Sequence, residues 1–194
     1  STCYLNGNIN NFTALNNLTN VSGNLGIYSN SNLSVIDGFA NLTSTGSLSI
    51  NSNNILTSIT GFTSLGTINW ALEISGHPFL SDISGLDHTI TMNSVNINNN
   101  SFLSNCAVEA ICNKLWQNPN SVTINNNGTN CSSNAVVLQN CGAAPDTDGD
   151  GVNNFIDNCP AVANPSQSDC NNNGIGDACD AASDSDNDTI LDNV

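Results

Sequence analysis

The chain has 194 residues, with one Lys, no Arg and 16 acidic residues, for a formal net charge of -15. A phosphate-binding patch needs clustered cations, so this charge excludes nucleic acids and anionic membrane surfaces as partners and favours a metal cation. No apolar run approaches the roughly 20 residues that a membrane span needs, which predicts no membrane insertion. Eight cysteines predict disulfides and therefore an oxidising, extracellular compartment.

A repeat runs through residues 1–104. Its centre is an alternating L-x-I triplet, and successive copies lie 23, 24, 23 and 27 residues apart; the triplets end at Ile27, Ile50, Ile74, Ile97 and Ile124. Alternation predicts a short strand with two inward residues, and stacked copies would pair these strands in parallel, roughly 4.8 Å apart. One such unit cannot bury its apolar face alone, so we expect stacked repeats to share a continuous core.

Polar and small residues also recur in register with the triplet. Three residues after each final Ile stand Asn30, Asn53, His77, Asn100 and Asn127. We expect these Asn side chains to hydrogen-bond backbone groups of the turns, each one rung above the next, with His77 as a turn substitution. The glycines of the later turns, Gly38, Gly61 and Gly85, are expected to allow a turn that other residues resist.

This pattern resembles a leucine-rich-repeat solenoid of the receptor-L-domain-like kind, found in secreted proteins of Bacteroidetes-type bacteria. The resemblance implies a mainly β fold of short parallel strands and an extracellular or cell-surface, bacterial location. Residues 1–23, where the motif weakens, are expected to form a degenerate capping coil.

Residues 105–141 are predicted to form a cysteine-rich cap that closes the repeat. Apolar residues from Val108 to Leu115 follow a helical spacing, Ser104 or Asn105 could cap this helix, and a second short helix is expected near 133–139. Cys106 and Cys131 fall near equivalent core positions of neighbouring coils and are predicted to pair. Cys112 would then pair with Cys141 and join the two helices, although four cysteines allow three connectivities.

Composition changes abruptly in residues 142–194, where eleven of the 16 acidic residues lie, all of them Asp. A first loop places oxygen ligands at positions 1, 3, 5, 7, 9 and 12, with Gly at 6: Asp146, Asp148, Asp150, the carbonyl of Val152, Asn154 and Asp157. A second loop repeats the plan with Asp169, Asn171, Asn173, Asp177 and Asp180. A third, truncated loop offers Asp184, Asp186, Asp188 and Asp192 but has Thr189 at position 6.

Ca²⁺ takes six to eight oxygen ligands, and a short loop supplies them when alternate side chains turn inward. Between the loops stand Asp157-Asn158-Cys159-Pro160, Asn164-Pro165-Ser166-Gln167 and Gly176-Asp177-Ala178-Cys179-Asp180. Residues 146–192 thereby resemble thrombospondin type 3 repeats. The resemblance implies two or more Ca²⁺ ions, little regular secondary structure and a Cys159–Cys179 disulfide. Cys3 and Cys170 are left over; they could pair with each other, pair with another chain or stay free.

No enzyme active site is visible: the chain has two histidines, two isolated glutamates and no nucleophile-elbow pattern. We therefore expect a secreted, calcium-binding structural or adhesive surface protein, including the protomer of an extracellular filament built from copies of itself. The alternative is a module that recognises a glycan or protein from a calcium-stiffened stalk. An ice-binding solenoid is a minor alternative, because the outward strand residues form an irregular series rather than a Thr ladder.

Overall fold

The computed structural model describes residues 2–89 and 91–180. The chain forms two compact units, Ser1–Gly142 and Ala143–Val194. The helices and strands of the described residues all lie in the first unit, so the fold is mainly β, with parallel strands, some helices and three disulfides. Within the described residues, no helix combines the length and the apolar character that a membrane span requires.

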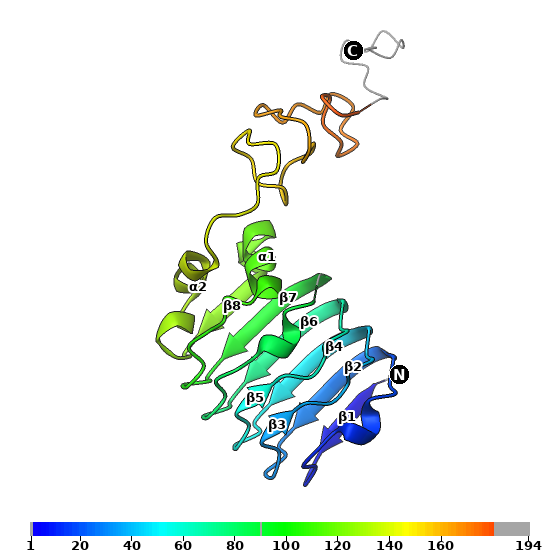
Figure 1. Cartoon of the computed structure of the whole chain (residues 1–194), viewed down its shortest axis with the longest axis vertical. Coiled ribbons are helices and arrows are strands. Elements are labelled where there is room, and N and C mark those ends of the chain that lie inside the picture. Colours follow the sequence, from blue (N-terminus) through cyan, green and yellow to red (C-terminus); the bar gives the residue numbers. More distant parts are fainter. Residues whose placement is uncertain (1, 90, 181–194) are drawn as a thin grey trace. The chain divides into compact units, whose positions relative to one another are not determined.

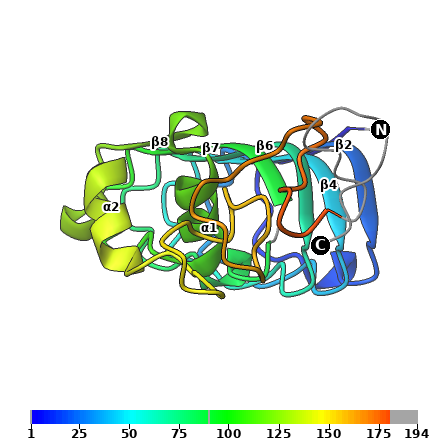
Figure 2. The ribbon, with the colours of Figure 1, turned by 90° about the horizontal axis from the view of Figure 1, so that it is seen from above.

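A six-stranded parallel sheet forms one side of the first unit (Figures 1 and 2). Its strands follow in chain order: β1 (Cys3–Asn6), β2 (Asn20–Tyr28), β4 (Ser44–Asn51), β6 (Thr67–Ser75), β7 (Thr91–Asn98) and β8 (Val122–Asn125). The L-x-I triplets pair in register, so that Ile27 lies beside Ile50 and Ile74 beside Ile97. β1 continues the sheet from the region expected to be degenerate, with Leu5 paired to Ile27.

The other side of the repeat is held by shorter elements. β3 (Val35–Ile36) and β5 (Ser58–Ile59) form a two-stranded parallel sheet, which an isolated bridge from Ser58 to Asp82 extends. The 3₁₀ turns η1 (Thr13–Leu15) and η2 (Ser84–Leu86) lie in the first and fourth repeats. Because every repeat adds one strand to the large sheet, residues about 23 apart in sequence become neighbours in space.

The core runs through the whole first unit as columns of equivalent apolar residues. Inward strand residues such as Leu48 and Ile50 are completely buried, as are the Leu and Ile residues that follow each strand. One column is aromatic: the ring centroids of Phe12 and Phe39 lie 5.2 Å apart, and Phe39 stacks on Phe62 at 4.9 Å. Each repeat therefore buries its apolar side chains against the next one.

Gly38, Gly61 and Gly85 serve packing rather than the left-handed turn expected from the sequence. A Cβ atom on Gly38 would lie 2.7 Å from the backbone oxygen of Phe12, and one on Gly61 or Gly85 would overlap the carbonyl oxygen of the glycine one repeat earlier. The positive φ falls on the following residue instead, at Phe39 (64°) and Phe62 (62°). These positions require glycine because the backbones of consecutive repeats touch there.

The recurring Asn residues form a ladder of hydrogen bonds along the turns after the strands. The side-chain oxygen of Asn53 accepts from the N–H of Asn30 at 2.9 Å, and that of Asn127 accepts from the N–H of Asn100 at 3.0 Å. Each side-chain amide also donates to a carbonyl of the preceding repeat, such as Asn53 to Ile27 at 3.0 Å and Asn100 to Ile74 at 3.1 Å. The expected ladder is thus present, and both the oxygen and the nitrogen of these side-chain amides are hydrogen-bonded.

His77 takes the same place in the ladder. Its Nδ1 accepts from the N–H of Asn53 at 3.2 Å, which leaves the proton on Nε2 to donate to the carbonyl of Ile50 at 2.9 Å. Its own N–H donates to the side-chain oxygen of Asn100 at 3.0 Å. Burial lowers the pKa of His77 below its ordinary value, so the ring is neutral and reproduces the acceptor and donor of an Asn amide.

Two helices close the β8 end of the first unit: α1 (Glu109–Gln117) and α2 (Asn134–Cys141), with the 3₁₀ turns η3 (Pro119–Ser121) and η4 (Thr129–Cys131) beside them. The structure contains the Cys106–Cys131 and Cys112–Cys141 disulfides. The predicted cap of α1 is wrong: Val108 occupies the N-cap, and Asp87 of an earlier repeat accepts from the N–H of Glu109 at 2.6 Å. Asn105 instead accepts from the N–H of Ala107.

The free edge of β8 is paired in part by one side chain of α2 and in part by an isolated antiparallel bridge between Asn125 and Ser133. Asn134 accepts from the N–H of Ile124 at 3.0 Å and donates to the carbonyl of Val122 at 2.6 Å. The amide therefore pairs with the last strand as a further strand would, and an unpaired sheet edge is covered.

Candidate metal centre

The first acidic loop, residues 146–157, curls around the carboxylate of Asp146. This carboxylate accepts from the N–H of Gly149 at 2.9 Å and from that of Gly151 at 3.1 Å. Both glycines have positive φ, at 77° and 95°, which allows the chain to turn twice within three residues. The glycine at position 6 thus has the backbone role that the sequence pattern predicts.

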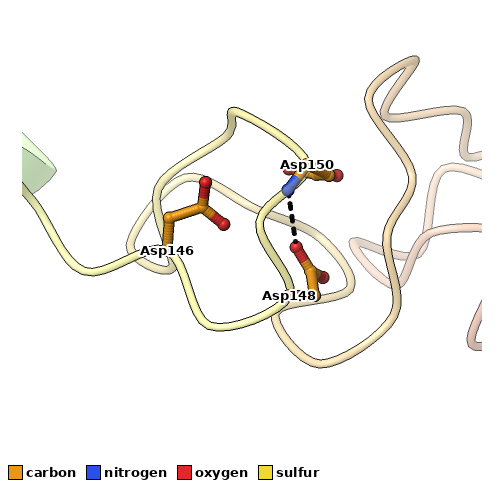
Figure 3. A group of neighbouring side chains, drawn as sticks. All are labelled: Asp146, Asp148 and Asp150. Carbon is orange, nitrogen blue, oxygen red and sulfur yellow. Dashed lines mark hydrogen bonds between the residues drawn. The ribbon is translucent and has the colours of Figure 1, made fainter.

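Three carboxylates of this loop converge. Ligand atoms of Asp146, Asp148 and Asp150 all lie within 4.8 Å of one another, and Figure 3 shows the three side chains close together on the first loop. Asp148 accepts from the N–H of Asp150 at 3.2 Å, and Asp150 accepts from that of Val152 at 2.8 Å. The carboxylates of these alternate residues therefore lie close together, and their negative charges repel one another.

Two carboxylate oxygens of the first loop are buried without a hydrogen-bond partner in the described part of the chain: Oδ2 of Asp148 and Oδ2 of Asp157. A buried, unpaired carboxylate oxygen is costly because it has lost water and gained nothing in return. Burial first, then the charges of Asp150, Asp157 and Asp146, raise the pKa of Asp148. Asp148 and Asp157, which stand nine residues apart, are close enough to repel each other.

The second loop, residues 169–180, has the same hydrogen-bond pattern as the first. Asp169 at position 1 accepts from the N–H of Gly174 at position 6, as Asp146 does from Gly151. Position 9 accepts from the N–H of position 2 in both loops, through Asn154 and through Asp177. The shared scaffold shows that the two stretches are copies of one structural unit, as their spacing predicts.

The two loops differ in how their side-chain oxygens are matched. In the second loop, positions 3 and 5 are Asn171 and Asn173, and both amides donate to the carboxylate of Asp180, at 3.0 and 2.8 Å. In the first loop the same positions are Asp148 and Asp150, which cannot donate to Asp157. In the second loop the amides at positions 3 and 5 donate to the carboxylate at position 12, whereas the first loop has carboxylate oxygens without a donor among the described residues.

A compact connector joins the loops. The Cys159–Cys179 disulfide links residues that stand after the first loop and at the end of the second. Gln167 accepts from the N–H of Asn158 at 2.8 Å and donates to Asp157 at 2.9 Å. The N–H of Asn164 donates to the second oxygen of Asp150 at 2.7 Å. The sequence did not predict these roles of Gln167 and Asn164, because contacts that do not recur at a fixed spacing leave no signal in it.

The remaining sequence-based candidates are one backbone carbonyl, the third loop and two cysteines. Val152 follows Gly151 in the first loop and is half-buried, and its N–H donates to Asp150 at 2.8 Å. The third loop, with Asp184, Asp186, Asp188 and Asp192, lies outside the described residues. Cys3 and Cys170 take part in none of the three disulfides; the thiol of Cys170 donates to Asp177 at 3.0 Å.

Comparison with known proteins identifies the second unit. Residues 140–167 and 168–194 each match the family model of the thrombospondin type 3 repeat. Such repeats are calcium-binding extracellular repeats, so the chain carries two calcium-binding repeats beside its parallel-stranded first unit. No curated protein and no solved structure matches the chain.

Proposed function

We propose that this chain is a secreted, calcium-binding structural or adhesive protein of the bacterial cell surface. The observation that carries the proposal is the first acidic loop, where three carboxylates converge and two buried oxygens lack any hydrogen-bond partner in the described residues. A hard divalent cation satisfies such oxygens and cancels their repulsion, and Ca²⁺ suits a flexible, oxygen-only ligand set.

In this proposal the first ion is held by both orphan carboxylates and their neighbours in the loop. The ligands are the side chains of Asp146, Asp148, Asp150, Asn154 and Asp157 and the carbonyl of Val152. The second ion is held by Asp169, Asn171, Asn173, Asp177 and Asp180, whose scaffold is the same. The ligand set of the second loop has fewer carboxylates, so we expect weaker binding there.

The first unit is the displayed part of the molecule in this proposal. Its in-register repeats and continuous core support a solenoid of the leucine-rich, receptor-L-domain-like kind, with residues 105–141 as its cap. Three disulfides support an oxidising, extracellular environment. Calcium would stiffen the second unit into a spacer, and strings of such units would suit an extracellular filament. The proposal includes no catalytic activity.

A calorimetric titration of the whole chain tests the calcium sites. We expect at least two ions per chain, with the affinity of the tighter site about tenfold weaker in Asp148→Asn and the weaker site lost in Asp169→Asn. Val162→Ala, at an exposed position of the connector outside both ligand sets, is the matched control and should titrate as the parent does. Absence of saturable calcium binding would overturn the proposal.

Electron microscopy separates the filament from the alternative of a monomeric recognition module. Polymers that form as protein concentration rises, and that a chelator disperses, would support the filament. A chain that stays monomeric with calcium bound would contradict the filament and favour the module. The exposed aromatic residues of the sheet are the observation that favours that second function.

A further inference from the structure

The outer face of the six-stranded sheet is polar and almost uncharged. Because Leu25 and Ile27 point into the core, the residues between and after such pairs point outward. These outward positions are mostly amides and hydroxyls, such as Asn51 and Ser75, which are joined by a 2.8 Å hydrogen bond. Glu73 is the only charged residue among the outward positions of the six triplets and the residues that follow them.

Aromatic rings lie on glycines at two places of this face. A Cβ atom on Gly26 of β2 would overlap the ring of Tyr28 and would lie 2.7 Å from the ring of Tyr4, its partner on β1. A Cβ atom on Gly46 of β4 would lie 2.7 Å from the ring of Trp70, which projects from β6. At Gly26 only glycine lets the two tyrosine rings rest directly on the sheet, whereas Gly46 also meets the backbone oxygen of Gly23, 2.6 Å from the same Cβ position.

The rings are supported on one side and open to solvent on the other. Tyr4 is 59 % exposed and Trp70 is 53 % exposed, although both are large and partly apolar. The rings of Tyr4 and Tyr28 lie 5.8 Å apart and support each other. Such fixed aromatic surfaces with hydrogen-bonding neighbours are typical of recognition sites rather than of inert protein surface.

The charge of the face selects the partner. Phosphate, sulfate and carboxylate ligands are repelled by a chain of net charge -15, and no cation stands among the outward positions to hold them. A cationic partner would find only Glu73. Sugar rings carry apolar C–H faces that stack on aromatic rings, and their hydroxyls both donate to and accept from amides. A neutral carbohydrate is therefore the partner that the face matches.

The positions of the two glycines set the length of that partner. Gly26 pairs with Ser49 of β4, and Gly46 stands three residues earlier on β4. The register of β4 shifts between Thr45 and Leu48, so the strand is irregular at Gly46, and three residues along the chain separate the two aromatic platforms by roughly 10 Å. An oligosaccharide chain spans such a distance, whereas a single sugar does not.

We propose that the outer face of the sheet binds neutral oligosaccharide chains, with Trp70 and the Tyr4–Tyr28 pair as two stacking platforms. This assignment names a ligand class for the first unit and is independent of calcium binding by the second. Substitution of one platform removes half of the stacking surface, so affinity should fall about tenfold or more.

The test uses the calcium-loaded whole chain and hexaoses of cellulose, chitin, laminarin and mannan, with glucose as the short control. Titrations are followed by calorimetry and by the fluorescence of Trp70, in a Trp116→Phe background. We expect at least one hexaose to bind and glucose not to bind. Trp70→Leu keeps apolar cover over Gly46 and should weaken binding tenfold or more; Tyr28→Ala should do the same.

Phe102→Ala is the matched control, since Phe102 is 62 % exposed in the turn after β7 and lies outside the outward strand positions. It should leave the affinity within twofold. Absence of binding to every neutral hexaose, equal affinity of Trp70→Leu and the parent, or a peptide or acidic polysaccharide that binds in their place would overturn the proposal. Calcium titration of the same samples reports on the second unit separately, so failure of either proposal is recognised by itself.

Discussion

In both units a side-chain oxygen accepts a hydrogen bond from a backbone N–H, but the remaining polar atom of that side chain is paired in the first unit and unpaired in the first acidic loop. In the first unit, the side-chain oxygen of Asn53 accepts a backbone N–H while its amide nitrogen donates to a backbone carbonyl. In the first acidic loop, the oxygens of Asp148 and Asp157 accept backbone N–H groups, and their second oxygens are left buried and unpaired. An amide ladder is complete by itself, whereas a carboxylate loop is complete only with a cation.

The second acidic loop is intermediate between the Asn ladder and the first acidic loop, and it shows which residues make the difference between them. It has the backbone of the first loop but Asn at positions 3 and 5, and those amides donate to the carboxylate of Asp180. Exchange of Asp for Asn therefore converts a loop that needs a cation into one that is paired without it. We infer that the number of carboxylates, rather than the loop backbone, sets how strongly each loop depends on calcium.

Calcium removal should give the largest effect and should separate the two units. With EGTA, we expect the amides of Gly149, Gly151 and Val152 to exchange with deuterium at least 100-fold faster, since bound ligand at 100 times its Kd contributes about 2.7 kcal/mol of stability. The ladder amides of Asn30 and Asn100 should change less than twofold. Equal acceleration in both units would contradict the comparison.

The ladder should fail when one rung is removed, whatever the calcium concentration. Asn53→Ala leaves the N–H of Asn30 and the carbonyl of Ile27 buried without their partner, at about 1–3 kcal/mol for each group. We expect urea unfolding in excess calcium to show a loss of about 3 kcal/mol in the free energy of unfolding. Its exposed neighbour gives the control: Asn54→Ala should cost less than about 0.5 kcal/mol.

The repeat, its ladder and the loop positions could be read from the sequence because each follows a fixed spacing. Asn53 and Asn100 recur in register with the strands, and their partners are fixed once the repeats stack. Contacts that do not recur with the repeat left no spacing signal in the sequence. The cap that Asp87 provides for α1, and the bond between Gln167 and Asp157, depend on how separate segments meet.

The packing also gives some residues a different structural role from the one that the sequence predicted. Gly61 was expected to allow a turn, but its small size lets two backbones touch, and Phe62 takes the left-handed conformation. The orphan oxygen of Asp157 could not be predicted either, because it depends on which neighbours lack a donor. Spacing predicts which residues enter a loop, and only their packing shows which of them remain unsatisfied.

Exchange of one residue between the two acidic loops should shift their calcium affinities in opposite directions. Asn171→Asp removes an amide that donates to Asp180 and adds a carboxylate at position 3, so the second loop should bind calcium about tenfold more tightly. Asp148→Asn makes the reverse change and should weaken the first loop by a similar factor. Calorimetric titration of both variants measures the two sites. If the affinities stay unchanged, the carboxylate number does not set the difference between the loops.

His77 should give the smallest effect, because it perturbs a ladder that otherwise does not titrate. Burial lowers its pKa in the folded chain, so below the ordinary histidine pKa of about 6.5 the unfolded chain binds more protons than the folded one. The free energy of unfolding should therefore fall as pH drops from 6.5 toward the folded-state pKa, and it should not change with His77 above that window. His77→Asn restores the amide of the other rungs and should remove this part of the pH dependence. Urea unfolding at pH 7.5 and 5.5 in both proteins isolates it, since the acidic loops titrate alike in the two. If the change in the free energy of unfolding between pH 7.5 and 5.5 is the same in both proteins, the buried ring accepts a proton without losing its ladder hydrogen bonds, which contradicts the prediction.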